Sequence, residues 1–261
     1  MGAIKQFFKI VFSSNYSFSK ERYRDSFLQN DFDSSQVKPF QKLERRIFCF
    51  WTGNNEMSKN RLESLSSLKK NTGVEIVLVT PKNLDTFILS DFPLHKSFQY
   101  LSAVHKSDYL RCYFMHHYGG GYSDIKCSTN NWESLFMKLE KQTSKWIVGY
   151  REIGERGVAH VEHPIIASDL IKNWQHLIGN GAYICRSYTP FTAEWYNELH
   201  HRMDYYYQQL IQCPGNIMGD NEGYAIPWTG ILGQIFHPLC LKYIDKILYS
   251  NKIKPVLSKY R

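Results

Sequence analysis

Two apolar runs on either side of a helix-like segment decide the fold: Arg46-Ile47-Phe48-Cys49-Phe50-Trp51 and Val74-Glu75-Ile76-Val77-Leu78-Val79-Thr80-Pro81. The first run is followed by turn residues, and the second is β-branched and ends on a proline, so both predict strands. Between them, Ser58 is placed to cap a helix that runs to about Asn71, with leucines at a spacing of three. This order of strand, helix and strand indicates a parallel sheet and an α/β fold.

The carboxyl ends of such strands form the expected binding edge, and Trp51-Thr52-Gly53 and Thr80-Pro81 lie there. A nucleotide is the usual ligand at this edge. Neither a G-x-G-x-x-G nor a P-loop sequence follows the first strand, so neither glycine-rich cradle is predicted. Position alone leaves Trp51 open, because a large aromatic residue could equally belong to the core.

Composition narrows the class of protein. The chain has 261 residues, 16 Phe, 18 Tyr and 6 Trp, which exclude disorder and suffice for one large domain. No run of about 18 apolar residues predicts a membrane span, and the first twelve residues are interpreted as mature chain, not as a signal peptide. The six cysteines form no C-x-x-C pair, which favours reduced thiols in a cytoplasmic protein. The net charge of +8 is compatible with nucleic acid, an anionic membrane surface or an anionic substrate.

The most informative segment runs from Leu101 to Ser128. Residues 103–118 lack helix breakers and are followed by three glycines, which predicts a helix that ends abruptly. Alternation over residues 122–127 then predicts a short strand with Tyr122, Asp124 and Lys126 on one side.

Within the predicted helix, a spacing of three places Asp108 and Arg111 on one face. An ordinary ion pair is the alternative to a functional role for these two residues. The carboxylate and the ammonium of the following strand point the same way, just past glycines that permit a close approach of backbone or ligand.

These residues resemble a known signature. The runs His105-Lys106-Ser107-Asp108-Tyr109-Leu110-Arg111 and Tyr118-Gly119-Gly120-Gly121-Tyr122-Ser123-Asp124-Ile125-Lys126 are similar to the A-x-x-S-D-x-x-R … Y-G-G-x-Y-x-D-x-D pattern. That pattern is typical of sugar transferases with a DXD motif, namely family 32-like enzymes and bacterial capsular polysaccharide synthesis proteins. The catalytic domains of the large clostridial toxins are more distant relatives. Phe50-Trp51-Thr52-Gly53 resembles the I-W-x-G element of the group, so the likeness covers residues 46–128.

The resemblance implies a GT-A fold, in which a single nucleotide-binding α/β domain has a mostly parallel central sheet flanked by helices and an appended C-terminal acceptor region. We therefore expect an N-terminal lead-in over residues 1–45 and one domain over 46–261, with a donor-binding half at about 46–150 and an acceptor half at about 151–261. It also implies a hexosyltransferase that moves a hexose or N-acetylhexosamine, with retention, from a nucleotide-sugar, UDP favoured, to a glycan or undecaprenyl-linked acceptor. The product would be capsule, O-antigen or lipopolysaccharide.

Position by position, the resemblance implies that Trp51 stacks on the base and that Asp108 and Arg111 hold the donor sugar and ribose. Asp124 corresponds to the first aspartate of the motif and is a candidate metal ligand. Further donor-binding candidates are Thr52, Gly53, Gly120, Gly121 and Tyr122, and the catalytic candidates are Arg111, Asp124 and Lys126.

Lys126 stands where the motif has its second aspartate. The departing nucleoside diphosphate gains negative charge, which Mg²⁺ or Mn²⁺ on two carboxylates usually neutralises. An ammonium could supply part of that charge, so we expect either no need for Mn²⁺ or Mg²⁺, or weak binding through Asp124 and a later ligand. A solvated strand residue is the alternative for Lys126.

A late loop, residues 218–230, combines acids, an amide, glycines and a tryptophan, as functional loops often do. By analogy with sugar transferases, further metal ligands could come from Asp220, Asn221 or His237, and acceptor contacts from Glu222 and Trp228. An ordinary turn is the alternative for each.

Positive charge gathers at the termini. Residues 241–261 contain six Lys or Arg and one acid, Asp245, and Lys5 and Lys9 flank the Phe-rich amino terminus. This pattern predicts peripheral association with an anionic membrane surface, the inner face of the cytoplasmic membrane.

Three classes of function are compatible with the sequence: a glycosyltransferase, a non-catalytic nucleotide-sugar or glycan-binding relative with a degenerate metal site, and a nucleic-acid-binding protein. Only net charge suggests the last. No nucleic-acid module is recognisable and the lysines do not interleave with aromatic residues, so no nucleic-acid partner is predicted.

Overall fold

The computed structural model describes residues 16–30, 37–38 and 42–258, which form an α/β fold around a six-stranded sheet of order β2-β1-β3-β5-β4-β6. Its strands are β1 (Arg46–Phe50), β2 (Glu75–Val79), β3 (Gly120–Ser123), β4 (Ile147–Arg151), β5 (Ile178–Cys185) and β6 (Ile247–Tyr249). The α-helices of the described residues are α1 (Lys59–Asn71), α2 (Ala103–His117), α3 (Glu133–Lys141), α4 (Pro164–Lys172), α5 (Pro190–Gln212) and α6 (Gly233–Lys242). The predicted α/β class is confirmed.

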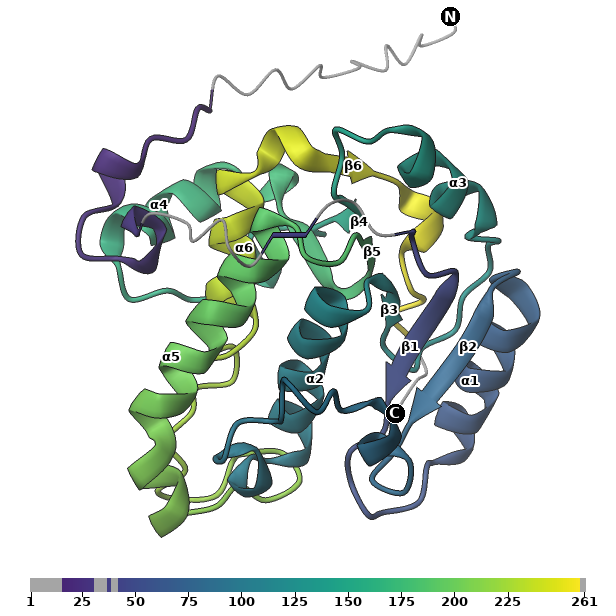
Figure 1. The fold of residues 1–261 in the computed structure, drawn as a ribbon, viewed down its shortest axis with the longest axis horizontal. Coiled ribbons are helices and arrows are strands. Elements are labelled where there is room, and N and C mark those ends of the chain that lie inside the picture. Colours follow the sequence, from purple (N-terminus) through teal and green to yellow (C-terminus); the bar gives the residue numbers. More distant parts are fainter. Residues whose placement is uncertain (1–15, 31–36, 39–41, 259–261) are drawn as a thin grey trace, which may run out of the picture.

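The sheet is mostly parallel, as predicted. Among the described strands, β5 alone runs against its neighbours, and the other five share one direction (Figure 1). The carboxyl ends of β1, β3 and β4 therefore lie at one edge of the sheet together with the beginning of β5. This is the edge at which ligands bind in open α/β sheets.

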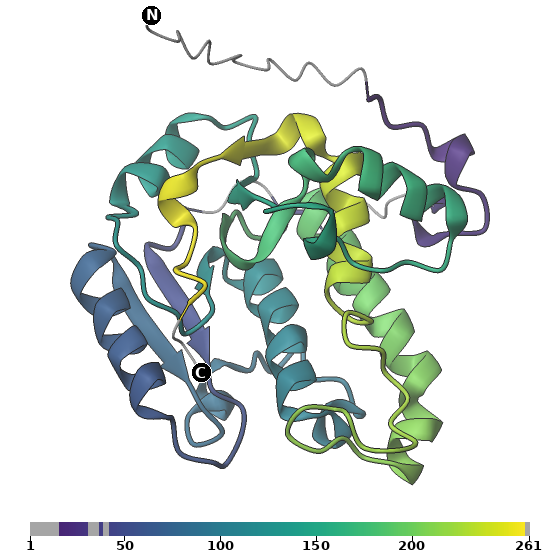
Figure 2. The same ribbon diagram turned by 180° about the vertical axis from the view of Figure 1, so that it is seen from behind.

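Helices cover both faces, which explains why the strands are apolar without interruption. In β1, Phe48 and Phe50 face a core built with α2, α4, α5 and α6, whereas Ile47 and Cys49 face α1 and α3. Seen from behind, the blue helix α1 lies beside β1 and β2, far from the green helix α5 (Figure 2).

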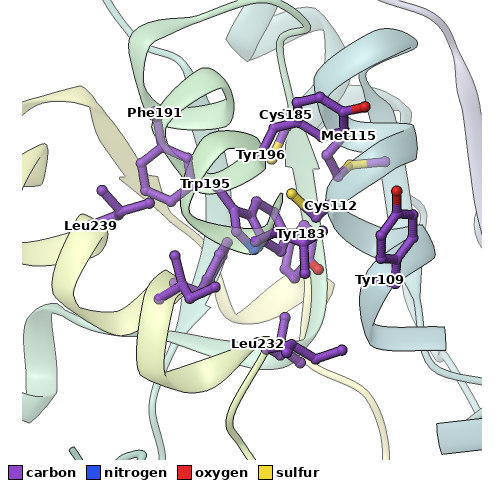
Figure 3. Close-up of a cluster of buried hydrophobic side chains, with 14 of the residues drawn as sticks. Tyr109, Cys112, Met115, Tyr183, Cys185, Phe191, Trp195, Tyr196, Leu232 and Leu239 are labelled. Carbon is purple, nitrogen blue, oxygen red and sulfur yellow. The ribbon is translucent and has the colours of Figure 1, made fainter. Parts of the chain in front are cut away.

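The larger core lies where α2, α5 and α6 meet β5 (Figure 3). Trp195 of α5 contacts Tyr183 of β5 and Phe236 of α6 edge to face, with ring centroids 6.1 and 4.8 Å apart. Such pairs add to the free energy of burying the rings. This packing fixes α2 against the sheet, and α2 carries Asp108 and Arg111.

Helix termini follow the sequence closely. Ser58 caps α1 by accepting a hydrogen bond from the Arg61 amide, and Ser102 caps α2 in the same way. Gly119 ends α2 with φ +68°, and a Cβ there would lie 2.8 Å from the Ser187 amide nitrogen. Glycine is therefore required at this turn.

The strand predicted over residues 122–127 is wrong at both ends. β3 begins at Gly120 and its pairing with β5 stops at the Ser123–Ala182 pair. Asp124 and Lys126 follow the strand in a turn, in which the Lys126 amide donates to the Asp124 carbonyl at 2.7 Å.

Residues 16–30, which belong to the expected lead-in, contribute to the core, because Tyr23 and Leu28 are buried there. Arg22 and Tyr23 both donate to Asp169 of α4. Lys5 and Lys9, which the membrane prediction uses, lie outside the described residues.

All six cysteines are free, as predicted. A search of the described residues finds no helix with the length and apolarity that crossing a membrane requires.

Candidate functional site

A cavity of about 540 Å³ opens at the carboxyl ends of β1 and β3, and we call it the β1–β3 cavity. Its walls come from the segment after β1, the first turns of α1 and α2, the turn after β3, and the connection between α5 and α6. Its lining comprises Phe50, Trp51, Thr52, Gly53, Asn55, Arg61, Ala103, Val104, Ser107, Arg111, Tyr122, Asp124, Ile125, Lys126, Ile217, Met218 and Trp228.

Arg111 is the centre of the charged wall. Its guanidinium lies 3.3 Å from a carboxylate oxygen of Asp108 and 3.2 Å from one of Asp124, and it donates to the Asn180 carbonyl at 3.0 Å. It also lies over the Tyr122 ring, 4.5 Å from the centroid. Helix α2, the turn after β3 and the beginning of β5 thus meet at one side chain.

Asp124 joins two cations. Its Oδ2 accepts from Lys126 Nζ at 2.8 Å, and its Oδ1 accepts from the Tyr122 hydroxyl at 2.5 Å. Burial alone would raise the pKa of this carboxyl, but Arg111 and Lys126 outweigh burial and hold the pKa below its usual value. Asp124 is therefore ionised at neutral pH.

Asp108 has a different role, because it is 4% exposed and does not line the cavity. Burial raises its pKa, although Arg111 opposes this effect. Asp108 pairs with Arg111 on the side away from the cavity and so orients its guanidinium. The structure thus brings together the Asp108–Arg111 pair that the helical spacing predicted, and adds Asp124 to it.

The charge of the lining favours an anion. Among the described residues, Arg61, Arg111 and Lys126 line the cavity as cations and Asp124 as the single acid. Arg61 donates to the Ile125 carbonyl at 2.7 Å, which holds it at the wall. Positive charges that converge in a cleft concentrate anionic ligands there.

Trp51, Thr52 and Gly53 lie at the cavity as expected from the strand order. The Trp51 indole donates to the Asn55 carbonyl at 2.7 Å, and the Thr52 hydroxyl donates to the Ala103 carbonyl. Trp51 is partly exposed, so its ring remains accessible for stacking.

Gly120 and Gly121 do not line the cavity, although Tyr122 does. A Cβ at Gly120 would lie 2.9 Å from the Arg46 carbonyl, and one at Gly121 would lie 2.8 Å from the Ile47 side chain. Both glycines let β3 approach β1 closely, so the neighbour that needs their small size is protein rather than ligand.

Only part of the late loop, residues 218–230, lines the β1–β3 cavity. Trp228 lines the cavity and is 58% exposed, whereas Glu222 is exposed and lies outside the cavity. Asp220 and Asn221 are likewise absent from the lining and accept hydrogen bonds from the side chain and the amide of Asn216. In this arrangement the two residues hold the loop in its turn.

His237 lies in α6 and is fully buried. Its Nδ1 accepts from the Ala159 amide at 3.1 Å, and burial lowers the pKa of the ring to about 4. Its Nε2 lies 3.3 Å from the Asn180 side-chain nitrogen, so it touches the residue whose carbonyl binds Arg111, but it does not line the cavity.

A divalent ion does not fit the donor set of this cavity. Both oxygens of Asp124 already contact cations or a hydroxyl, and Asp124 is the one acid in the described lining. Within residues 16–30, 37–38 and 42–258, no group of three or more His, Cys, Asp or Glu side chains could hold a metal ion. The carboxylates of Asp108 and Asp124 do approach each other, but the guanidinium of Arg111 lies between them and pairs with both.

Comparison with known proteins identifies the family. A model of the family described as "capsular polysaccharide synthesis protein" matches residues 3–146, more than half of the chain. The chain belongs to this family. The resemblance seen in the motifs of α2 and β3 is thereby confirmed for the capsular polysaccharide synthesis proteins, and the chain has a role in capsular polysaccharide synthesis. No curated protein and no solved structure matches it.

In this capsular polysaccharide synthesis protein, some residues of the cavity escaped sequence reasoning. Arg61 follows a helix cap by three residues, and Ile217 directly precedes the late loop, residues 218–230. Asn180 contributes through its backbone carbonyl. Of these residues, only Arg61 could have been predicted from the sequence, because the first turn of a helix that follows a strand lies at the same binding edge as the end of that strand.

Proposed function

We propose that the protein is a glycosyltransferase that moves a hexose or N-acetylhexosamine from a nucleotide-sugar, UDP favoured, to a glycan or lipid-linked acceptor, with retention. The observation that carries this proposal is the convergence of Arg61, Arg111 and Lys126 with two accessible tryptophans in one cavity. Cations suit a diphosphate, an aromatic face suits a base, and Asp124 suits sugar hydroxyls. Membership of the family supports the assignment to polysaccharide synthesis.

The residues would catalyse a single displacement step at the anomeric carbon. The bond between the anomeric carbon and the diphosphate oxygen breaks, and a bond from the acceptor oxygen to that carbon forms on the same face. The acceptor proton passes to the departing phosphate oxygen, so no protein base is needed. Arg111 and Lys126 would stabilise the negative charge that grows on the diphosphate.

Lys126 would neutralise the negative charge of the departing diphosphate, which a divalent ion does at a motif with two aspartates. An ammonium about 4 Å from a phosphate oxygen contributes on the order of 4 kcal/mol at an effective dielectric near 20, equivalent to roughly a thousandfold in rate if it acts only in the transition state. Its position 2.8 Å from Asp124 supports this role, because the pair is held together before the donor binds. We therefore propose that turnover does not require a divalent ion.

The decisive experiment measures hydrolysis of UDP-sugars by the purified protein, together with thermal shifts on UDP. Wild type should hydrolyse at least one UDP-sugar slowly. Asp124→Asn should reduce the rate by about a hundredfold or more, because Asp124 pairs with both Arg111 and Lys126 and holds these cations where the diphosphate charge grows. Asp245→Asn is the matched control, since Asp245 pairs with Lys246 at the surface. Equal rates in wild type and Asp124→Asn would refute the proposed site.

Metal independence is tested separately with EDTA. Activity should persist in EDTA, and adding Mn²⁺ should change it little. A complete loss that Mn²⁺ restores would refute the proposed role of Lys126 while leaving the donor site intact.

A non-catalytic role is the second candidate, because Lys126 occupies the second oxygen of Asp124. In that case UDP would raise the melting temperature of the wild type, and the protein would neither hydrolyse nor transfer any UDP-sugar. A ligand at 100 times its dissociation constant adds about 2.7 kcal/mol to the free energy of unfolding, so a thermal shift readily detects binding.

The lipid-linked acceptor entails contact with an anionic membrane surface. The described C-terminal lysines are divided: Lys242 pairs with Glu194 and Lys246 with Asp245, whereas Lys252 is exposed. Co-sedimentation with liposomes should increase with anionic lipid and fall with salt. Binding that responds to neither would count against this part of the proposal.

A further inference from the structure

A second cavity, of about 500 Å³, opens at the same edge of the sheet, and we call it the β4 cavity. It lies at the carboxyl end of β4, beside the turn that precedes β5 and the turn that follows β6. Its lining includes Arg151, Glu152, Trp174, Gln175, Asn251 and Lys254. None of the motifs in the sequence pointed to it.

The side chains of the β4 cavity suit a hydroxyl-rich ligand. Trp174 is half-buried and offers a ring, Gln175 and Asn251 offer amides, and Glu152 offers a carboxylate. Flat apolar rings with amide and carboxylate groups around them match a sugar, whose C–H faces are apolar and whose hydroxyls need donors and acceptors. Two cations, Arg151 and Lys254, lie beside the carboxylate.

Glu152 is the most unusual of these groups, because it lines a cavity while being 8% exposed. Its Oε1 accepts from the Ile153 amide at 2.8 Å. Burial raises its pKa, and Lys254 opposes this effect. A buried carboxylate at the base of a cavity is a strong acceptor for a hydroxyl that replaces water.

A chain of contacts joins the β4 cavity to the β1–β3 cavity. Glu152 Oε2 lies 3.8 Å from His237 Nε2, and that nitrogen lies 3.3 Å from the Asn180 side chain. The Asn180 carbonyl accepts from Arg111, which lines the first cavity. Only two residues, His237 and Asn180, separate the carboxylate of one cavity from the guanidinium of the other.

We infer that the β4 cavity binds the acceptor saccharide, with a sugar ring on Trp174 and a hydroxyl on Glu152. This inference rests on the proposed function, since a transferase needs a second substrate next to the donor. It places the acceptor on the β4 side of the sheet edge rather than at Glu222 or Trp228. Glu152, Trp174 and Asn251 then act as specificity-determining residues.

The test uses saturation-transfer NMR with methyl glycosides of glucose, galactose, N-acetylglucosamine and glucuronic acid as probes. Wild type should transfer saturation to at least one of them. Trp174→Ala should weaken that binding by about fivefold or more, in line with the energy of one aromatic contact. Trp228→Ala is the matched control, because its ring lies in the other cavity, and it should bind the glycoside like wild type.

Glu152→Gln provides a second variant that preserves shape, and it should also weaken glycoside binding. UDP should shift the melting temperature of wild type, Trp174→Ala and Glu152→Gln equally, which shows that each variant is folded. Unchanged glycoside binding in both variants, loss of it in Trp228→Ala, or no glycoside bound by wild type would each overturn the inference. Failure of the proposed function looks different: UDP would then neither bind nor be released from a UDP-sugar, whatever the glycosides do.

Discussion

The middle and the end of helix α2 surround ionisable groups with different neighbours. In the middle, Asp108 and Arg111 belong to a network in which Asp124 stays ionised because two cations face it. At its end, His116 and His117 lie among aromatic rings, and burial lowers the pKa of His116 to about 3 and that of His117 to about 4. Charge persists where opposite charges compensate it, and is disfavoured where burial among rings and a nearby cation, Lys38, oppose it.

This contrast separates the part of α2 that lines the β1–β3 cavity from the part that packs in the core. Removing a member of the charged network should leave a charge without its partner. The histidines should instead make the free energy of unfolding depend on pH.

Arg111→Met should lower stability by about 3–5 kcal/mol, because the buried Asp108 and the partly buried Asp124 then lose their shared partner. Chemical denaturation measures this. Arg45→Met is the matched control, since Arg45 makes a bidentate pair with Glu140 at the surface and should cost about 0–1 kcal/mol. Equal losses in the two variants would mean that the network around Arg111 is no more coupled than a surface ion pair.

The buried histidines should make stability fall as the pH drops from about 6.5 towards 4. Burial lowers the pKa of several histidines, namely His116, His117, His200 and His237. The unfolded chain, with a histidine pKa near 6.5, therefore binds protons that the folded chain does not bind. Stability is therefore complete above pH 6.5, and each histidine contributes a slope of up to about 1.4 kcal/mol per pH unit below it.

The measurement is the free energy of unfolding between pH 7 and 5.5, a range in which most carboxyl groups stay ionised. His116→Gln should reduce the slope by the share of one histidine. A slope that does not change in this variant would show that His116 is protonated equally in both states.

Substitutions of two tryptophans should separate ligand binding from fold stability. Trp51→Ala should weaken UDP binding by about 1–3 kcal/mol, the cost of losing one stacked base, and leave the melting temperature without ligand nearly unchanged. Trp195→Ala, in the core of Figure 3, should instead lower stability by about 3–5 kcal/mol. Isothermal titration with UDP and thermal melts distinguish the two, and a Trp51→Ala variant that binds UDP normally would assign the base to another surface.

The sequence allowed the fold to be predicted wherever local patterns suffice. The uninterrupted apolar strand before Trp51, the cap at Ser58 and the break at Gly119 each follow from the chemistry of neighbouring residues. The Asp108–Arg111 pair follows from helical spacing. Its connection to Asp124 was expected only from family resemblance, because it depends on how α2 packs against β3.

Contacts between distant segments could not be predicted. Glycines at 120 and 121 resembled a ligand-binding turn, yet they serve the approach of β3 to β1, which depends on the register of two strands. The β4 cavity combines residues 151–153, 174–176 and 251–254, and no spacing in the sequence connects these segments.

The reversed direction of β5 has a consequence for how the protein can diverge. Its first residues, Asn180 and Gly181, meet Arg111 and Asp124 through backbone carbonyls, which substitutions do not remove. Just before them, residues 174–176 face the β4 cavity with side chains, which substitutions change freely. A substitution at Asn180 or Gly181 therefore leaves the acceptor for Arg111 or Asp124 in place, whereas a substitution in residues 174–176 changes the lining of the β4 cavity.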